Sequence, residues 1–279
     1  MIAMSLRREV GLLMEAVAQR AIIPRFQRLA GGDVTEKSPG EIVTSADLEA
    51  ERLLAEGLAH LCPGARIVGE EAVSADPGLL SGVGRGLVWL VDPLDGTANF
   101  ADGRAPFGVM VALVENGAPQ MGWMLDVVTG RMCFAEAGRG AFIDDEPIKA
   151  RAPLSRRPVA ALGTQFLDAH RREHVHAHAS RHFERVPIPR CAAESYPRLV
   201  LGENDLALFQ RSLPWDHAAG ALFVNEAGGR VTHWDRSPYR VGGSGTGILA
   251  ASSHHLWEFG AEVLLGVEAG LANMEELIR

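Results

Sequence analysis

The first sixty residues carry apolar positions at the spacing of amphipathic helices. One helical face is marked by Leu6, Val10, Leu13, Val17 and Ala21, and another by Ala50, Leu53, Leu54, Leu58 and Leu61. This spacing predicts a helix from residue 5 to about 29, ending near Gly31-Gly32, and a second from about 46 to 61. Between them, residues 37–40 are predicted to form a loop and residues 42–44 a short extended segment.

Two apolar runs then end in acidic residues. Residues 67–68 predict a short strand that leads into Gly69-Glu70-Glu71. Residues 86–91 predict a buried strand, which is expected to stop at Asp92 because Pro93 has no N–H to donate to a neighbouring strand. Asp92 and Asp95 are therefore expected on a tight turn. Residues 75–86 are predicted to form a surface loop.

The rest of the chain predicts a sheet followed by mixed elements. Residues 108–142 show the short runs and turn signals of antiparallel hairpins. The boundary is placed in residues 153–158, which gives an N-terminal α+β half, 1–152, and a C-terminal α/β half, 153–279. The second half is predicted to contain strands at 159–163, 186–190 and 246–251, and helices at 168–183 and 256–277. Asp216 is expected at the start of a further helix.

Charge and composition exclude several classes of protein. The chain has 279 residues with a formal net charge of −8, which argues against binding to nucleic acids or to anionic membranes. Three cysteines, far apart, predict no disulfide framework and favour a cytoplasmic location. No signal peptide and no apolar stretch of about 20 residues is evident.

The predicted helix at 168–183 carries a row of histidines. Four of them, spaced by four residues, share one face: His170, His174, His178 and His182. This spacing can chelate a transition metal. No motif of known mechanism accompanies it, so the favoured interpretation is a solvated face with adventitious metal binding, and we assign it no role.

Five acidic residues and one threonine, at the ends of predicted elements, form the candidate site. The set consists of Asp47, Glu70, Asp92, Asp95, Thr97 and Asp216. Each has an ordinary interpretation by itself, as a helix cap or as part of a solvated turn. Together, carboxylate oxygens are the ligands preferred by Mg²⁺, Mn²⁺ or Ca²⁺. Two such ions about 3.5–4 Å apart suit in-line displacement at phosphorus, and the amides of Gly96 and Thr97 are placed to hold phosphate oxygens.

These residues also carry a resemblance to a known family. The chain resembles the inositol monophosphatase family in Val43-Thr44-x-x-Asp47, Gly69-Glu70-Glu71, Asp92-Pro-Leu-Asp-Gly-Thr97, Trp215-Asp216-x-Ala-Ala-Gly220 and Glu226-Ala-Gly-Gly229. The resemblance implies an α/β (α+β) fold, the layered αβαβα sandwich of the inositol monophosphatase and fructose-1,6-bisphosphatase type. It also implies a homodimer and Mg²⁺-dependent, often lithium-sensitive, hydrolysis of a small phosphate monoester.

The resemblance implies a role for each matching residue. Glu70, Asp92 and the carbonyl of Leu94 would hold one metal ion, and Asp92, Asp95 and Asp216 a second. Two or three Mg²⁺ ions are expected, with Mn²⁺ a possible substitute. Thr97, oriented by Asp47, would position the attacking water, with Glu70 also in the catalytic set. Lys37 matches a family lysine near the mouth of the site.

Departures from the family pattern affect the expected substrate. The usual Asn-Phe-x-His is Asn99-Phe-Ala-Asp102 here, and Cys191-Ala-Ala-Glu194 replaces a Gly-Ser segment. Phe209 stands where inositol-hydrolysing members have a hydroxyl-binding Glu, which weakens polyol recognition. Lys37, Glu194 and Phe209 are candidate substrate contacts. The alternatives to an inositol-1-phosphate-like ester are histidinol-phosphate, a 3′-phosphonucleotide, or a non-catalytic, partner-binding protein of the same fold.

Overall fold

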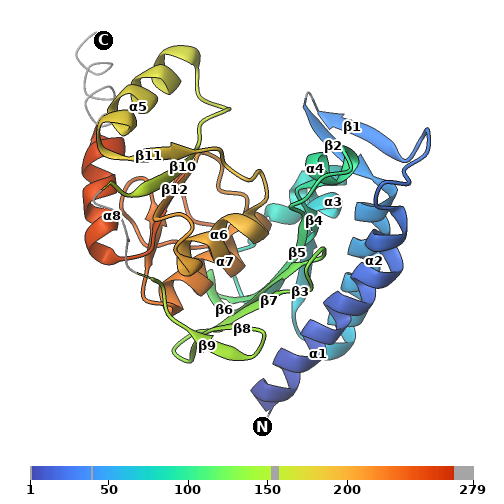
Figure 1. The fold of residues 1–279 in the computed structure, drawn as a ribbon. Coiled ribbons are helices and arrows are strands. Elements are labelled where there is room, and N and C mark those ends of the chain that lie inside the picture. The colour runs from blue at the N-terminus through green and yellow to red at the C-terminus, as the bar shows by residue number, and fades with distance from the viewer. Residues whose placement is uncertain (1, 39, 152–156, 267–279) are drawn as a thin grey trace.

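The computed structural model describes residues 2–38, 40–151 and 157–266, and these form five alternating layers (Figure 1). Helices α1 (Ile2–Val17) and α2 (Ser45–Leu61) cover one face of a seven-stranded sheet. Helices α6 (Ala192–Leu201) and α7 (Pro214–Glu226) lie between that sheet and a five-stranded one. Helices α5 (Ala169–His182) and α8 (His254–Gly260) cover the far side. The αβαβα sandwich is thus confirmed.

The larger sheet begins with the strands that carry the acidic residues. Its order is β3-β4-β5-β6-β7-β8-β9, with β3 parallel to β4 and every later pair antiparallel. The strands are β3 Arg66–Gly69, β4 Leu87–Asp95, β5 Gly108–Glu115, β6 Ala118–Asp126, β7 Met132–Glu136, β8 Gly140–Ile143 and β9 Glu146–Ile148. The antiparallel texture predicted for residues 108–142 is confirmed.

The smaller sheet belongs to the second half of the chain. Its order is β11-β10-β12-β14-β13, with β10 parallel to both of its neighbours. The strands are β10 Val159–Gly163, β11 Glu184–Val186, β12 Leu206–Phe209, β13 Arg230–His233 and β14 Ile248–Ala251. A two-stranded hairpin, β1 (Val34–Ser38) with β2 (Glu41–Thr44), precedes α2.

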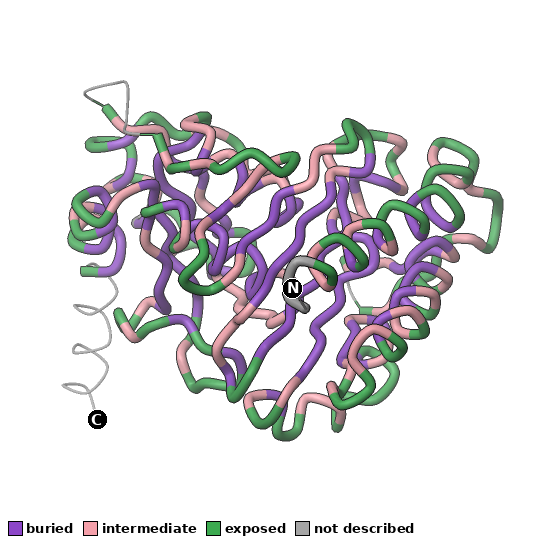
Figure 2. The backbone as a smooth tube through the Cα atoms, turned by 90° about the horizontal axis from the view of Figure 1, so that it is seen from below, coloured by how far each residue is buried: buried purple, intermediate pink, exposed green. Residues whose placement is uncertain are grey.

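Successive side chains along the strands point to opposite faces of the sheet and contribute to separate hydrophobic cores. In β4, Trp89 and Val91 pack toward α1 and α2, whereas Val88 and Leu90 pack toward α6 and α7, as expected for side chains that alternate between the faces of a sheet. Figure 2 shows buried backbone running through the middle of the molecule, with exposed segments along its outer helices. The division predicted at 152/153 falls in residues 152–156, outside the described residues. The core around α6 and α7 contains side chains from both sides of that point, and the division stays a prediction.

The first predicted helix is shorter than expected. The α-helix ends at Val17, and the chain continues through a π-helical turn, Ala18–Ile22, and a 3₁₀ turn, Ile23–Arg25. Pro24 lies in the 3₁₀ turn and lacks the N–H that a continued α-helix would need there, and the helical path ends at Arg25. The second helix is confirmed at Ser45–Leu61.

The strand before the acidic turn is longer than predicted. Strand β4 does not stop at Asp92 but passes through Pro93 to Asp95. Asp92 pairs with Met110 and Asp95 with Gly108. Between these two pairs, β4 therefore has one more residue than β5. This β-bulge accommodates the missing N–H of Pro93 and re-aims the following side chains, a common device beside functional sites.

Several boundaries differ where local sequence was ambiguous. Residues 37–38 belong to β1 rather than to a loop. Residues 187–190 are not a strand, because β11 ends at Val186 before Pro187. Strand β14 begins at Ile248, and the closing helix comprises α8 and a π-helical turn, Ala261–Leu265; its predicted end lies outside the described residues. The loop predicted at 75–86 includes a 3₁₀ turn, Pro77–Leu80.

Two further findings concern cysteines and membranes. Cys62, Cys133 and Cys191 are free thiols. Within the described part of the chain, no helix has the length and apolar character needed to cross a bilayer.

Candidate active site

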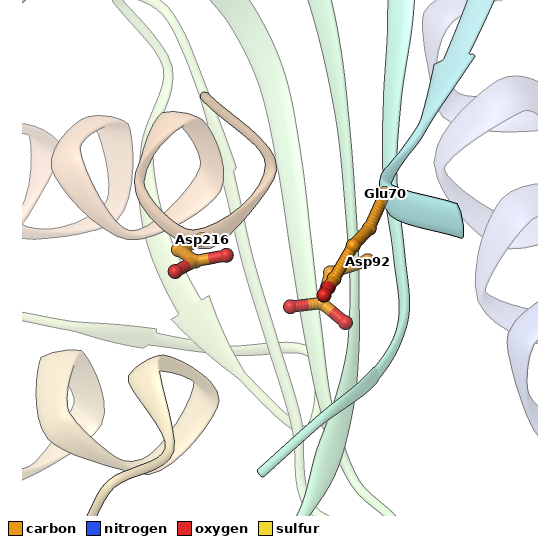
Figure 3. A group of neighbouring side chains, drawn as sticks. All are labelled: Glu70, Asp92 and Asp216. Carbon is orange, nitrogen blue, oxygen red and sulfur yellow. The ribbon is translucent and has the colours of Figure 1, made fainter. Parts of the chain in front are cut away.

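Three carboxylates from distant parts of the chain meet beside the ends of β3 and β4. Glu70 begins helix α3 (Glu70–Ala75), Asp92 lies in β4, and Asp216 lies in the first turn of α7. Each offers a carboxylate oxygen, and these oxygens all lie within 4.8 Å of one another. Figure 3 shows Glu70 and Asp92 reaching toward the same point, with Asp216 facing them from its helix.

Asp95 belongs to the same cavity but has a different immediate partner. Its Oδ2 accepts a hydrogen bond from the backbone N–H of Ala193 (2.6 Å), at the start of α6. The Oδ1 of Asp92 accepts one from the N–H of Leu94 (3.1 Å), within the bulge. The bulge and the start of α6 therefore orient these two carboxylates.

Asp216 is not the helix cap that the sequence suggested. Helix α7 begins at Pro214 with Leu213 as its N-cap, so Asp216 is the third residue of the helix. Proline at the first position needs no N–H partner. An acidic side chain in a first turn also benefits from the positive end of the helix dipole. This placement directs Asp216 toward Glu70 and Asp92 (Figure 3).

Lys37 and Glu51 hold the segment that carries Glu70. The Nζ of Lys37 donates to Glu70 Oε1 (2.9 Å) and to Glu71 Oε1 (2.8 Å). Burial alone would lower the pKa of Lys37, but the charges and hydrogen bonds of Glu70 and Glu71 outweigh it and raise that pKa. The buried carboxylate of Glu51, on α2, accepts the backbone N–H groups of Glu71 (2.7 Å) and Ala72 (2.8 Å). It thereby satisfies two of the unpaired donors at the start of α3.

Thr97 and Asp47 form a hydrogen-bonded pair at the edge of the cluster. The Oγ1 of Thr97 lies 2.9 Å from Asp47 Oδ1 and 2.9 Å from the carbonyl oxygen of Leu94. The other carboxylate oxygen of Asp47 accepts from the N–H (2.9 Å) and the hydroxyl (2.5 Å) of Thr44, which completes a capping box at the start of α2. Asp47 is thus both a helix-start residue and the partner of Thr97.

Burial and mutual repulsion make the cluster electrostatically unfavourable by itself. Burial, followed by the charges of Glu70, Asp95 and Asp216, raises the pKa of Asp92 well above its usual value. Burial also raises the pKa of Asp95 to about 6, although the N–H of Ala193 opposes the shift. A divalent cation held between the carboxylates would remove this repulsion. The oxygen-only donor set fits such an ion.

Two adjoining cavities open onto the carboxylates. One, of about 380 Å³, is lined by Lys37, Glu70, Asp92, Leu94, Gly96 and Thr97, among others. The second, of about 210 Å³, extends toward Phe166, Ile188 and Phe209. The two cavities share Asp95, Arg190, Arg211, Leu213 and Asp216.

Of the three candidate substrate residues, Lys37 lines the first cavity, and the structure separates the other two. Phe209 ends β12, lines the second cavity and stacks on Tyr196, with ring centroids 5.3 Å apart. Glu194 accepts hydrogen bonds from Arg131 (2.5 Å) and Arg198 (2.7 Å), and neither cavity is lined by it. We therefore do not include Glu194 among the proposed substrate contacts.

The histidine row lies on α5, which packs on the side of the five-stranded sheet away from α6 and α7 (Figure 1). His182 packs edge-on against Phe259, with ring centroids 5.7 Å apart. On the same helix, His176 Nε2 lies 2.8 Å from the hydroxyl of Thr164. These contacts tie α5 to the elements beside it.

Comparison with known proteins places the chain in a family. The model of the "Inositol monophosphatase family" matches residues 3–264. The chain belongs to the inositol monophosphatase family. A Mycobacterium leprae protein named inositol-1-monophosphatase is 35% identical over 231 residues, covering 79% of this chain and 78% of that protein. The family was expected from the motifs, and this expectation is confirmed.

Two further similar proteins carry different names. A Vibrio cholerae protein named Nus factor SuhB is 30% identical over 203 residues, covering 71% of this chain and 74% of its own. The structure of a Thermotoga maritima IMPase superposes with a TM-score of 0.77 at 26% identity, covering 93% of this chain and 96% of that one.

Sequence reasoning missed several residues of this family member's site. Glu51 and the two cavity arginines, Arg190 and Arg211, were not singled out. The capping box of Thr44 and Asp47 could have been recognised from the spacing of these two residues in the sequence. Glu51 lies one helical turn after Asp47 and therefore on the same face of α2, which was an available signal. The positions of the arginines depend on how distant loops come together, so local sequence gave no signal for them.

Proposed function

We propose that this protein is a Mg²⁺-dependent phosphatase that hydrolyses a small phosphate monoester. The observation that carries the proposal is the convergence of Glu70, Asp92 and Asp216 within 4.8 Å, beside the Thr97–Asp47 pair. Carboxylates that gather in this way on separate elements, in one cavity, suit a hard divalent cation. Membership of the inositol monophosphatase family supports phosphate esters as the substrates.

The proposed metal ligands are those that the family resemblance implies. Glu70, Asp92 and the carbonyl of Leu94 would hold one ion, and Asp92, Asp95 and Asp216 would hold another, with Mg²⁺ as the proposed metal and Mn²⁺ as a substitute. Such ions, when bound, would lower the pKa of a water molecule and stabilise the charge on the leaving oxygen. Lys37 would hold Glu70 in place through its 2.9 Å contact.

Thr97 and Asp47 would orient the attacking water. Two acceptors, Asp47 Oδ1 and the Leu94 carbonyl, lie 2.9 Å from the single hydroxyl of Thr97. A hydroxyl has one proton, so donation of that hydrogen bond to Asp47 leaves the lone pairs of Oγ1 free to accept a hydrogen bond from water. Thr44 fixes the Asp47 carboxylate through its other oxygen. The N–H groups of Gly96 and Thr97 would hold phosphate oxygens in the same cavity.

A panel of phosphate esters tests this proposal. Metal-stripped protein is assayed for inorganic phosphate release from inositol 1-phosphate, histidinol phosphate and adenosine 3′-phosphate, with and without Mg²⁺. We expect hydrolysis that appears with Mg²⁺ and disappears with chelator, and the relative rates identify the preferred class. Release from none of the esters, with either Mg²⁺ or Mn²⁺, would contradict the proposal.

A partner-binding role is the second candidate, because one relative is named a Nus factor. The completeness of the acidic cluster favours catalysis, since a purely binding role would not require it. Absence of hydrolysis together with one stoichiometric partner would favour the second candidate. We also propose a homodimer in the cytoplasm. Sedimentation equilibrium tests the dimer, and fractionation of the native cells tests the location.

A further inference from the structure

The second cavity continues directly from the acidic cluster. Asp95 and Asp216 line both cavities, so an ester whose phosphate lies among the carboxylates has room for its alcohol portion in the second cavity. With a volume of about 210 Å³, that cavity suits a group the size of a sugar or a single ring. Its lining therefore bears on which alcohol the protein accepts.

The charge of this lining is positive apart from the two shared carboxylates. Arg190 and Arg211, which like Asp95 and Asp216 line both cavities, are its positively charged side chains. The apolar part of the wall comprises Phe166, Ile188, Phe209 and Leu213. At position 209, an aromatic ring replaces the carboxylate that the resemblance associates with binding of sugar hydroxyls. An anionic group in this cavity would meet two guanidinium groups.

Arg211 is held in place at the junction of the two cavities. Its side chain pairs with Glu41 of β2, and its guanidinium lies 4.9 Å from the centre of the Phe166 ring. Its carbonyl oxygen lies 3.0 Å from His217 Nε2. A carbonyl oxygen only accepts, so His217 Nε2 carries the proton and donates this hydrogen bond. The Arg211 backbone is therefore fixed beneath the cavity.

Arg190 is fixed by its backbone and has an exposed side chain. Its φ of 57° is left-handed, a strained conformation for a residue with a side chain. The preceding carbonyl, that of Pro189, accepts a hydrogen bond from Asn99 Nδ2 (3.0 Å). In the described part of the chain, no carboxylate forms an ion pair with Arg190, which lines both cavities. A guanidinium without an ion-pair partner among the described residues is suited to bind an anionic ligand group.

We propose that the second cavity recognises a second anionic group, a phosphate or a carboxylate, on the alcohol portion of the substrate. Arg190 and Arg211 contact that group, and the apolar wall contacts the carbon skeleton between it and the scissile ester. This inference rests on the proposed phosphatase function, and it narrows the substrate class from phosphate monoesters in general to those with two anionic groups.

Matched ester pairs test the inference. Fructose 1,6-bisphosphate is compared with fructose 1-phosphate, adenosine 3′,5′-bisphosphate with adenosine 3′-phosphate, and 2-phosphoglycerate with glycerol 2-phosphate. The first two pairs test a phosphate and the third a carboxylate. We expect kcat/KM to be about tenfold or more higher for the bis-anionic member of at least one pair, mainly through KM, because the remote group binds alike in ground state and transition state.

Variants assign that preference to the arginines. R190Q and R211Q should each take this kcat/KM ratio most of the way to one, because each removes a charge-assisted contact with the second anionic group. R185Q, on exposed β11 outside both cavities, is the matched control and should leave it unchanged. E41Q removes the partner of Arg211 but keeps the guanidinium, and should also retain the preference. Equal kcat/KM within all three pairs, or a preference that R190Q and R211Q both leave intact, would overturn the inference.

Product binding separates this inference from the proposed function. Calorimetry measures adenosine 5′-phosphate against adenosine, and fructose 6-phosphate against fructose. We expect the phosphorylated member to bind more tightly, and R190Q to remove the difference. If no ester is hydrolysed but this difference is found, the phosphatase proposal fails while the anion site stands. Equal binding of both members would count against the anion site whatever the activity.

Discussion

The carboxyl group of Glu51 occupies the space that a side chain on Gly69 would need. A Cβ built on Gly69 would lie 2.3 Å from Cδ of Glu51, far inside any permitted contact. Glu51 comes from α2, and Gly69 ends β3 immediately before Glu70. The missing side chain allows Glu51 to reach the N–H groups of Glu71 and Ala72. The helix start that presents Glu70 is therefore fixed by a residue outside the acidic cluster.

Substitution of Gly69 should weaken metal binding. G69A would displace the Glu51 carboxylate and with it the first turn of α3, so we expect the Kd for Mg²⁺ to rise about 10- to 100-fold, the range for residues that orient metal ligands. E51A should act similarly. Calorimetric titration with Mg²⁺ measures the change. The matched control is G64A, where an added Cβ meets nothing within 4 Å. Unchanged affinity in both G69A and E51A would show that Glu51 does not position Glu70.

Asp92 should be essential for turnover yet unfavourable for stability of the metal-free protein. D92N removes a buried charge that repels Glu70, Asp95 and Asp216, with almost no change in volume. We expect kcat to fall by about 10³-fold or more, because a lost ligand weakens metal-assisted catalysis worth several kcal/mol. Thermal unfolding in chelator at pH 8 should show a raised Tm. A lowered Tm would mean that Asp92 is stabilised by contacts other than a cation.

The stability of the metal-free protein should decrease as pH rises. Burial raises the pKa of Asp47 and of Asp95 to about 6, so the folded state binds more protons than the unfolded state between about pH 4 and 6. Where the folded state binds more protons, the free energy of unfolding falls with increasing pH. Their stabilising effect is therefore complete below about pH 4 and lost as pH passes 6.

Saturating Mg²⁺ should oppose that trend, because the ion binds ionised carboxylates and competes with protons. The Tm measured in chelator and in Mg²⁺ from pH 4.5 to 8 tests both statements. The gap between the two curves should widen as pH rises. Parallel curves would indicate that the titrating carboxylates do not bind the metal.

The hydroxyl of Thr97 should matter more than its bulk. T97V keeps the shape of the side chain but removes the 2.9 Å hydrogen bond to Asp47. We therefore expect kcat to fall by about 10²- to 10³-fold, as for the loss of a group that contacts the attacking water. T97S keeps the hydroxyl and should retain most activity. Steady-state kinetics on one ester, at saturating Mg²⁺, measures both. Equal activity of T97V and T97S would remove Thr97 from the proposed orientation of water.

Packing between α6 and α7 gives a test of the fold alone. A Cβ on Gly220 would lie 1.9 Å from the buried Tyr196 ring, so G220A should destabilise the protein by about 1–3 kcal/mol through overpacking. A Cβ added to Gly228 would meet nothing within 4 Å, but this residue has a φ of 97°. A loss of stability in G228A would therefore measure backbone strain rather than overpacking. Chemical denaturation measures both. No loss of stability in G220A would contradict the close contact between the two helices.

Much of the fold was predictable where one local pattern was strong. Helix α2 and the antiparallel strands followed from spacing and turn signals, because burial of one face imposes that spacing. The end of β4 was mispredicted because Pro93 normally ends a strand, whereas here a bulge accommodates it. The metal-ligand candidates were found through motif resemblance. Glu51, Arg190 and Arg211 were missed because their roles depend on tertiary contacts between segments far apart in the chain.

A crystal grown with Mn²⁺ and phosphate tests the central claim most directly. Anomalous difference density locates each Mn²⁺ ion independently of any assumed coordination. We predict at least one strong peak within bonding distance, about 2.0–2.3 Å, of carboxylate oxygens of Glu70, Asp92 and Asp216. Full-occupancy density elsewhere, with these three carboxylates free of metal, would contradict the account.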